Sequence, residues 1–167
     1  MEDVFQKLIL MIRAYYPVLY LHSYEYYRTK QKIKGIVELL RREGKKVNYY
    51  QWDCVYGLVQ ILPDKTEKRI ERMQNPLEVL AYILNSKKSG EKNIFVLDDI
   101  NNHIDRDEVK LMFRKIAEAT NNNTHAIILS SIYRLPAELE KYITVLQIPL
   151  PKRNELGEVL DIVAKQS

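Results

Sequence analysis

The chain has 167 residues, 46% of them hydrophobic and 29% charged, a composition typical of a globular domain with a substantial core and not of a disordered segment. Its single cysteine, Cys54, excludes an intrachain disulfide framework and a cysteine-based zinc site, and it fits a reducing compartment. The apolar runs are far shorter than the ~20 residues that span a bilayer, and the N-terminus does not follow the pattern of a signal peptide. We therefore expect a soluble intracellular protein with no membrane partner.

Helix and strand patterns alternate through the first half of the chain. Apolar residues at helical spacing predict a first helix that ends before Pro17, because the residue before a proline is pushed away from helical geometry. A second helix is expected to end near Gly44, which can take the left-handed position that follows a helix. The expected elements are helices through 5–12 and 33–40 and strands at 18–21 and 47–52.

The second half continues the alternation after an ambiguous segment. Residues 57–62 read as a short strand or as part of a hairpin, and 64–72 as a charged, exposed stretch. Asn75, Pro76 and Glu78 predict a helix start, because asparagine caps, proline suits the first helical position and glutamate completes a capping box. The remaining expected elements are a second capping box at 105–108 with its helix, helices at 135–139 and from 156, strands at 94–97, 126–129 and 144–148, and a turn at 121–123.

This order of elements predicts an α/β fold in one domain, residues 1–167, with a five-stranded, mainly parallel sheet between two layers of helices. Ligands of such sheets bind beyond the carboxyl ends of the strands. The residues expected at those ends are 22–24, 52–53, 98–99 and 130–131.

A glycine-rich phosphate loop is missing from the place where it would work. In a nucleotide hydrolase, backbone amides of a loop after the first strand hold the phosphates, together with a lysine and a Ser or Thr that reaches magnesium. The corresponding segment here, His22 to Lys30, contains no glycine and three tyrosines. The five glycines stand at 35, 44, 57, 90 and 157, and the single Gly-Lys pair is followed by another lysine. The sequence therefore predicts no phosphate loop of this type.

Asp98 and Asp99 follow the apolar run 94–97, in the pattern of a magnesium-binding carboxylate at the end of a buried strand. They are the candidate cofactor-binding residues. The competing interpretation is that they are polar residues that simply end a strand, with one of them bonded to nearby backbone amides.

Other catalytic chemistry finds no support in the sequence. The three histidines, 22, 103 and 125, do not share metal-ligand spacing, and no nucleophile elbow precedes a helix. Cys54 follows a strand end, but a lone cysteine is more often a small buried residue than a nucleophile. We predict no catalytic residue and no metal site.

Aromatic residues gather around the ends of the first two strands. They are Tyr24, Tyr26, Tyr27, Tyr49, Tyr50 and Trp52. Three roles remain open for them: core packing, a protein interface, in which Tyr and Trp are enriched, or stacking on bases of single-stranded nucleic acid. The last role would be helped by the stretch Arg28–Lys46, which has eight Lys or Arg against two Glu, although a solvated helix face explains that charge as well.

Several segments together resemble a family of AAA ATPases that occurs in cyanobacteria and is encoded as an open reading frame in some chloroplast genomes. The segments are RAYYPVLYL at 13–21, VNYYQWDCVYGL at 47–58, NPLEVL at 75–80, NIFVLDDI at 93–100, LPAELEKYITV at 135–145 and IPLP at 148–151. They cover nearly the whole chain in the same order.

The resemblance implies an N-terminal ATPase-like domain that lacks the phosphate loop, with a P-loop NTPase-like fold, joined to a C-terminal AAA module that carries a working one. It implies ATP and Mg as cofactors of the longer protein and none for this chain. Ser130 and Ser131 stand where an active module offers a sensor asparagine, and the chain ends at Ser167, where a helical lid would begin. The compartment expected is the cytoplasm, or the chloroplast stroma if the gene lies in a plastid.

We therefore expect a non-catalytic domain that acts in protein–protein interaction or regulation, with an active AAA module or a neighbouring subunit, or a second copy, as its partner. Two alternatives remain. One is an atypical ATP and magnesium site with Asp98 on the metal, and the other is a nucleic-acid adaptor that uses the basic stretch and the tyrosines.

Overall fold

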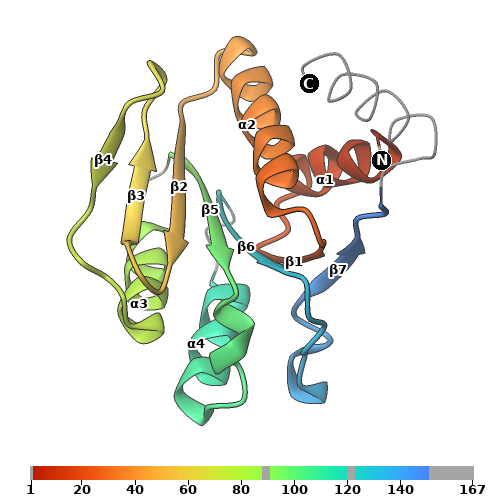
Figure 1. Cartoon of the computed structure of the whole chain (residues 1–167), viewed down its shortest axis with the longest axis vertical. Helices are drawn as coiled ribbons and strands as arrows, with labels where there is room; N and C mark the ends of the chain where they lie inside the picture. The colour runs from red at the N-terminus through yellow and green to blue at the C-terminus, as the bar shows by residue number, and fades with distance from the viewer. Residues whose placement is uncertain (1, 88–90, 120–122, 151–167) are drawn as a thin grey trace, which may run out of the picture.

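A computed structural model describes residues 2–87, 91–119 and 123–150, in which helices cover both faces of one sheet (Figure 1). The elements in chain order are α1 Glu2–Arg13, β1 Val18–His22, α2 Tyr26–Arg42, β2 Val47–Asp53, β3 Gly57–Ile61, β4 Glu67–Arg69, α3 Pro76–Ser86, β5 Lys92–Asp98, the 3-10 helix η1 Ile100–His103, α4 Asp107–Glu118, β6 Thr124–Ser130, the 3-10 helix η2 Ala137–Leu139 and β7 Thr144–Gln147.

The sheet has seven strands in the order β4-β3-β2-β5-β6-β1-β7. The five strands predicted from the sequence are β2, β5, β6, β1 and β7, and every pairing among them is parallel. The ambiguous segment after β2 adds two antiparallel strands, β3 and β4, so the expected five-stranded sheet is extended by a hairpin at one edge. The α/β fold with a mainly parallel sheet is confirmed.

Two hydrophobic clusters fill the space between the sheet and its helices. One joins α1 and α2 to one face of the sheet, and it includes Leu8 and Ile33. The other joins α3 and α4 to the opposite face, and it includes Leu80 and Phe113. Strands β5 and β6 are buried along nearly their whole length, as expected for parallel strands covered on both sides.

Most helix boundaries follow the local signals in the sequence. The Asn75 side chain accepts a hydrogen bond from the amide of Leu77 at 3.0 Å, as a cap should. Gly44 follows α2 at φ +88°, the left-handed conformation that ends helices. The prediction of a second capping box at 105–108 is wrong. Helix α4 begins at Asp107, and its N-cap is Arg106, whose side chain forms no capping bond. The helix expected from 156 and most of the turn at 121–123 lie outside the described residues.

Candidate functional site at the strand ends

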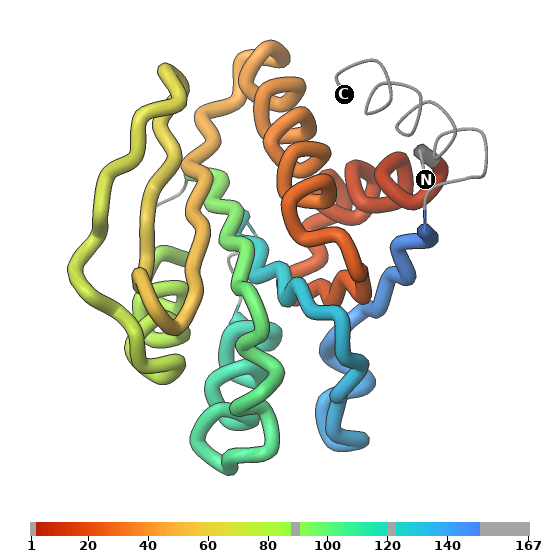
Figure 2. Tube along the Cα trace, in the orientation of Figure 1, coloured from red at the N-terminus to blue at the C-terminus, as the bar shows by residue number. Residues whose placement is uncertain are grey.

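The carboxyl ends of β1, β5 and β6 meet beside the start of α2, because these three strands are neighbours in the sheet and α2 follows β1 directly (Figure 2). His22 ends β1 and Tyr26 begins α2, so the connection consists of residues 23–25. This edge of the sheet holds Asp98, Asp99 and Ser131, as the sequence predicts.

Asp98 is engaged by a lysine that the sequence reasoning did not single out. The ammonium of Lys30, in the second turn of α2, forms an ion pair with the Asp98 Oδ2 atom. The other oxygen, Oδ1, is buried and has no hydrogen-bond partner among the described residues. Burial raises the pKa of Asp98, and the contact with Lys30 opposes that shift. The lysine therefore favours the ionised form of a poorly solvated carboxylate.

Asp99 is engaged by a tyrosine. The Tyr26 hydroxyl donates a hydrogen bond to Asp99 Oδ1 at 2.5 Å and accepts one from the amide of Ser131 at 2.9 Å. Asp99 itself has φ +57°, a left-handed conformation that is uncommon outside glycine and asparagine-like residues, and its amide donates to the carbonyl of Leu129 at 2.9 Å. Tyr26 thus ties the ends of β5 and β6 to α2.

The segment before Lys30 can be compared with the pattern of a phosphate loop. In the pattern Gly-x4-Gly-Lys, counting back from Lys30 puts the two glycines at Tyr24 and Thr29. Residues 26–29 form the first turn of α2 instead of a loop, and Thr29 is buried against Ser23 with 2.9 Å between their hydroxyl oxygens. Both glycine positions are therefore filled by other residues, and the backbone at 26–29 is wound into a helix.

Two backbone amides of the connection, those of Ser23 and Glu25, are also engaged. The Ser23 amide donates to the carbonyl of Ser130 at 3.0 Å, and the Glu25 amide donates to the Ser23 hydroxyl at 3.1 Å. The Thr29 amide donates to the carbonyl of Glu25 at 3.0 Å, as the first bond of α2. A phosphate cradle needs such amides directed at the ligand.

The six aromatic candidates separate into two groups. Tyr49, Tyr50 and Trp52 are each less than 10% exposed and belong to the core, two of them on one face of the sheet and one on the other. They alternate because successive side chains of a strand point to opposite faces. Tyr24 and Tyr27 are 62% and 77% exposed, whereas Tyr26 is partly buried. An interface role remains a prediction for the second group, whereas the first group has the core role.

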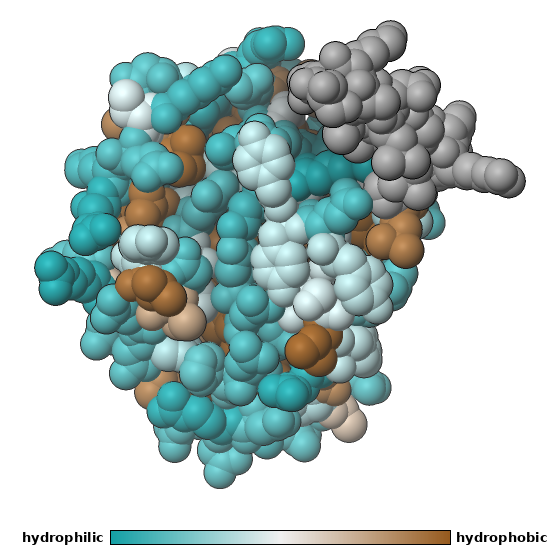
Figure 3. Space-filling model, viewed as in Figure 1, coloured by the Kyte–Doolittle hydropathy of each residue, from teal (hydrophilic) through white to brown (hydrophobic). Residues whose placement is uncertain are grey.

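Two further exposed residues extend the surface around Tyr24 and Tyr27. Ile132 and Tyr133 follow β6 and are both more than half exposed. The His22 ring lies between, with its centroid 5.4 Å from the Tyr24 ring and 6.3 Å from the Tyr133 ring. Figure 3 shows side chains of intermediate hydropathy gathered on this face, with a hydrophobic one beside them. We call Tyr24, Tyr27, Ile132 and Tyr133 the tyrosine patch.

The basic stretch 28–46 is partly engaged inside the fold. The contacts join Arg28 to Glu25, Lys30 to Asp98, Arg41 to the carbonyl of Val47, Lys45 to Glu43 and Lys46 to Glu91. Its charge therefore does not all face solvent, and a nucleic-acid role stays a prediction.

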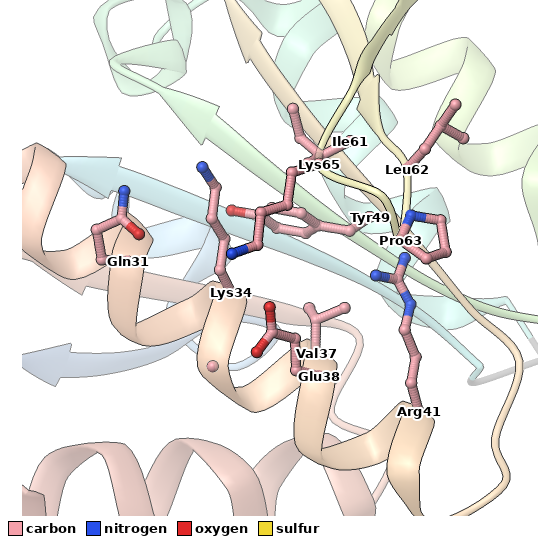
Figure 4. Close-up of a pocket in the computed structure, with 11 residues that line it drawn as sticks. Gln31, Lys34, Val37, Glu38, Arg41, Tyr49, Ile61, Leu62, Pro63 and Lys65 are labelled. Carbon is pink, nitrogen blue, oxygen red and sulfur yellow. The ribbon is translucent and has the colours of Figure 1, made fainter.

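A cavity of about 380 Å³ lies between α2 and the strands β2 and β3. Lys34 and Glu38 reach it from α2, and Lys65 reaches it from the loop after β3 (Figure 4). A second hollow of about 400 Å³ beside it includes Lys30 and Asp53. Both are lined by charges of either sign, and Asp98 and Asp99 line neither of them.

No group of three or more His, Cys, Asp or Glu side chains in the described part of the chain is arranged to hold a metal ion. Cys54 is exposed beyond the end of β2. None of the helices that the structure describes is long and apolar enough to cross a membrane.

Comparison with known proteins decides the family. The model of the SpoVK-like AAA ATPase N-terminal domain matches residues 4–148. The chain belongs to this family. The match confirms the resemblance drawn from the sequence segments, including the placement of the chain as an N-terminal domain.

Curated relatives of this SpoVK-like domain are longer than the chain. The AAA domain-containing protein ycf46 of Guillardia theta is 28% identical over 153 residues, which cover 90% of the chain and 28% of the relative. The ycf46 protein of Pyropia yezoensis is 26% identical over 161 residues, which cover 96% and 31%. The chain thus spans less than a third of the length of these relatives.

Solved structures share the fold of this SpoVK-like domain. The Aeropyrum pernix ORC2 protein, solved as ADPNP and ADP complexes, superposes with a TM-score of 0.58 at 14% identity, covering 98% of the chain and 50% of that protein. A chain of Drosophila ORC bound to GC-rich DNA and Cdc6 gives a TM-score of 0.50 at 12% identity, with 96% and 30% covered. At these identities the likeness shows the fold alone, which is P-loop NTPase-like.

Proposed function

We propose that the chain is a non-catalytic, ATPase-like domain of a longer AAA ATPase, and that it works by docking on a protein partner. The observation that carries the proposal is the pairing of Lys30 with Asp98 and of Tyr26 with Asp99. In a working site a lysine binds a phosphate and the strand-end carboxylate binds a magnesium ion. Here the lysine and the carboxylate bind each other.

ATP and Mg, the cofactors expected of the AAA family, do not fit these residues. A magnesium ion in such sites is held by one or two carboxylates together with phosphates and water. Asp98 Oδ1 is the one feature that favours it, since it is buried without a partner among the described residues. The phosphates would have to displace helical backbone at 26–29 and separate Lys30 from Asp98.

The tyrosine patch supports a docking role. Tyrosine offers a large, rigid contact area with a polar tip, and exposed apolar groups that lie together mark interaction surfaces more often than scattered ones do. The patch lies beside the ends of β1 and β6, at the edge of the sheet where ligands of such folds bind. The partner we propose is the active AAA module of the same protein or of a neighbouring subunit.

Calorimetric titration with ATP and magnesium tests the catalytic half of the proposal. We expect no saturable binding that depends on Asp98, so the wild type and Asp98→Ala should give the same heats. Micromolar binding that Asp98→Ala abolishes would overturn the proposal in favour of an atypical ATP site.

The docking half is tested with the AAA module from the same reading frame, purified separately and titrated with this domain. Replacing Tyr24 and Tyr27 by serine should raise the Kd at least about tenfold, because aromatic anchors at an interface carry much of its energy. Leu10→Ser removes an exposed apolar side chain of α1, outside the patch, and should leave the Kd unchanged. Equal affinity of the tyrosine variant and the wild type would refute the assignment of the surface.

A further inference from the structure

Lys92 is a buried lysine at the opposite end of the sheet from Asp98. It begins β5, which Asp98 ends, so the two residues are separated by the length of that strand, roughly 20 Å for six steps. Only 7% of Lys92 is exposed, although lysine is among the residues least often buried without a partner. Lys92 belongs neither to the site around Asp98 and Asp99 nor to the tyrosine patch.

The contacts of the Lys92 ammonium orient it without neutralising it. Its Nζ lies 3.0 Å from His125 Nε2, 3.4 Å from the carbonyl of Ile12, and 5.3 Å from the centre of the Tyr15 ring. Within the described residues it forms no ion pair with a carboxylate. Burial, with the nearby charge of Lys45, lowers the pKa of Lys92 to about 8.

His125 is neutral in this arrangement. Its Nδ1 lies 2.7 Å from the carbonyl oxygen of Tyr16, which can only accept, so Nδ1 carries the proton and Nε2 accepts from Lys92. Burial and the charge of Lys92 lower the pKa of His125 to about 4. The buried pair therefore carries one positive charge, which belongs to Lys92.

A cavity of about 300 Å³ opens in front of this charge, at the lower end of the roughly 300–1,000 Å³ typical of ligand pockets. Arg13, Lys45 and Lys46 line it together with Lys92, and among the described lining residues Glu91 carries the one carboxylate. Tyr15 also lines it, with φ +66°, a conformation that costs energy for a bulky residue and that holds its ring near Lys92.

We propose that this cavity is a binding site for a small ligand that carries a phosphate group, with Lys92 as its central donor and Arg13, Lys45 and Lys46 around it. A buried cation without a counter-ion is costly, and an anion in the cavity would supply one. Three of the four cations retain donors toward an anion: Arg13 and Lys46 bond Glu43 and Glu91 respectively with part of their N–H groups, and Lys45 lies 4.0 Å from Glu43.

The site differs in kind from a nucleotide site of the family fold. It lies at the amino ends of the parallel strands, its donors are side chains and not loop amides, and Asp98 and Asp99 take no part in it. Its occupation is independent of the docking role proposed above.

Calorimetry and thermal unfolding with sodium phosphate and with pyrophosphate test the proposal, against sodium chloride at the same ionic strength. Both phosphates should raise the Tm in a saturable way, and chloride should not. Lys92→Met keeps the buried stem and should weaken pyrophosphate binding at least about tenfold, the worth of one charge-assisted contact. Lys45→Gln, at the exposed rim, should weaken it about threefold with the fold intact.

The matched control is Lys68→Gln, which removes the same charge from β4, outside the cavity, and should leave pyrophosphate affinity unchanged. Equal stabilisation by chloride, or equal affinity of the wild type and both cavity variants, would overturn the proposal. Binding of a single-stranded oligonucleotide without any binding of pyrophosphate would overturn it too, because the cavity would then contact a polymer backbone and not a small ligand.

Discussion

Removing the ammonium of Lys30 should expose how strongly the strand-end site depends on its internal ion pair. Lys30→Met retains most of the side-chain volume and leaves Asp98 with neither of its oxygens bonded. The carboxylate then remains in a poorly solvated place with no cation beside it. Its pKa, already raised by burial, should rise further.

The size of the effect follows from the burial of the pair. Breaking a buried ion pair by removing one partner costs roughly 3–5 kcal/mol. The side chains of Lys30 and Asp98 keep 22% and 15% of their exposure, so water screens them in part and we take the lower end, about 3 kcal/mol. For a domain of this size that corresponds to a fall in Tm of about 6–12 °C.

Urea denaturation followed by circular dichroism measures this cost, and a double-mutant cycle isolates the pair. Lys30→Met with Asp98→Leu replaces both partners by apolar groups and should lie within about 1 kcal/mol of the wild type. Lys110→Met is the control, since its pair with Glu138 is at the surface, where water screens it, and the change should cost clearly less than Lys30→Met. If Lys30→Met cost no more than Lys110→Met, the ammonium would be free in solution and the reasoning about a self-occupied site would fail.

Two further predictions concern residues outside that pair. The lowered pKa of His125, about 4 against an ordinary 6.5, means that the unfolded chain takes up a proton between those values while the folded chain does not, so the free energy of unfolding should fall by about 3 kcal/mol as the pH drops through that window. His125→Asn should flatten this part of the pH profile in urea titrations, and an unchanged slope would contradict a neutral His125. Gly57→Ala should cost at least about 1 kcal/mol, because Gly57 has φ +78° and a Cβ would lie 3.0 Å from the amide of Met73. Gly35→Ala, inside α2 with open space around it, should instead stabilise the domain by about 0.5–1 kcal/mol in the same denaturation assay, and a loss in both variants would count against the role of the Gly57 backbone.

The parallel core of the fold could be predicted from the sequence because its strands are short, apolar and bounded by clear helix signals. Asn75 and Pro76 mark a helix start by local chemistry alone, and the structure places the cap there. The hairpin β3–β4 was harder, since β4 consists of three charged and exposed residues, which carry no hydrophobic alternation. Its pairing depends on β3 and not on its own side chains.

The site can be predicted only in part, because its contacts also join elements that are distant in the sequence. The position of Asp98 and Asp99 follows from the end of a buried strand, whereas the partner of Asp98 comes from a helix 68 residues earlier in the chain. A lysine in the second turn after the first strand is a usable sequence signal for Lys30. The pair of Lys92 with His125 joins two strands, and no pattern in either strand announces it.

The helical first turn of α2 determines what it would take to turn this edge of the sheet into a nucleotide site. In sequence the distance is short: glycines at 24 and 29 and a serine at 31 would complete the phosphate-loop motif around Lys30 with no insertion. In structure the distance is one turn of helix that would have to unwind, together with the bonds of Thr29 and Tyr26 that hold it. A variant with these three substitutions would match the motif in sequence. Its backbone at 26–29 could still be helical, with its amides bonded inside the helix. Recovery of ATP binding therefore has to be judged from the conformation of the segment and not from the motif.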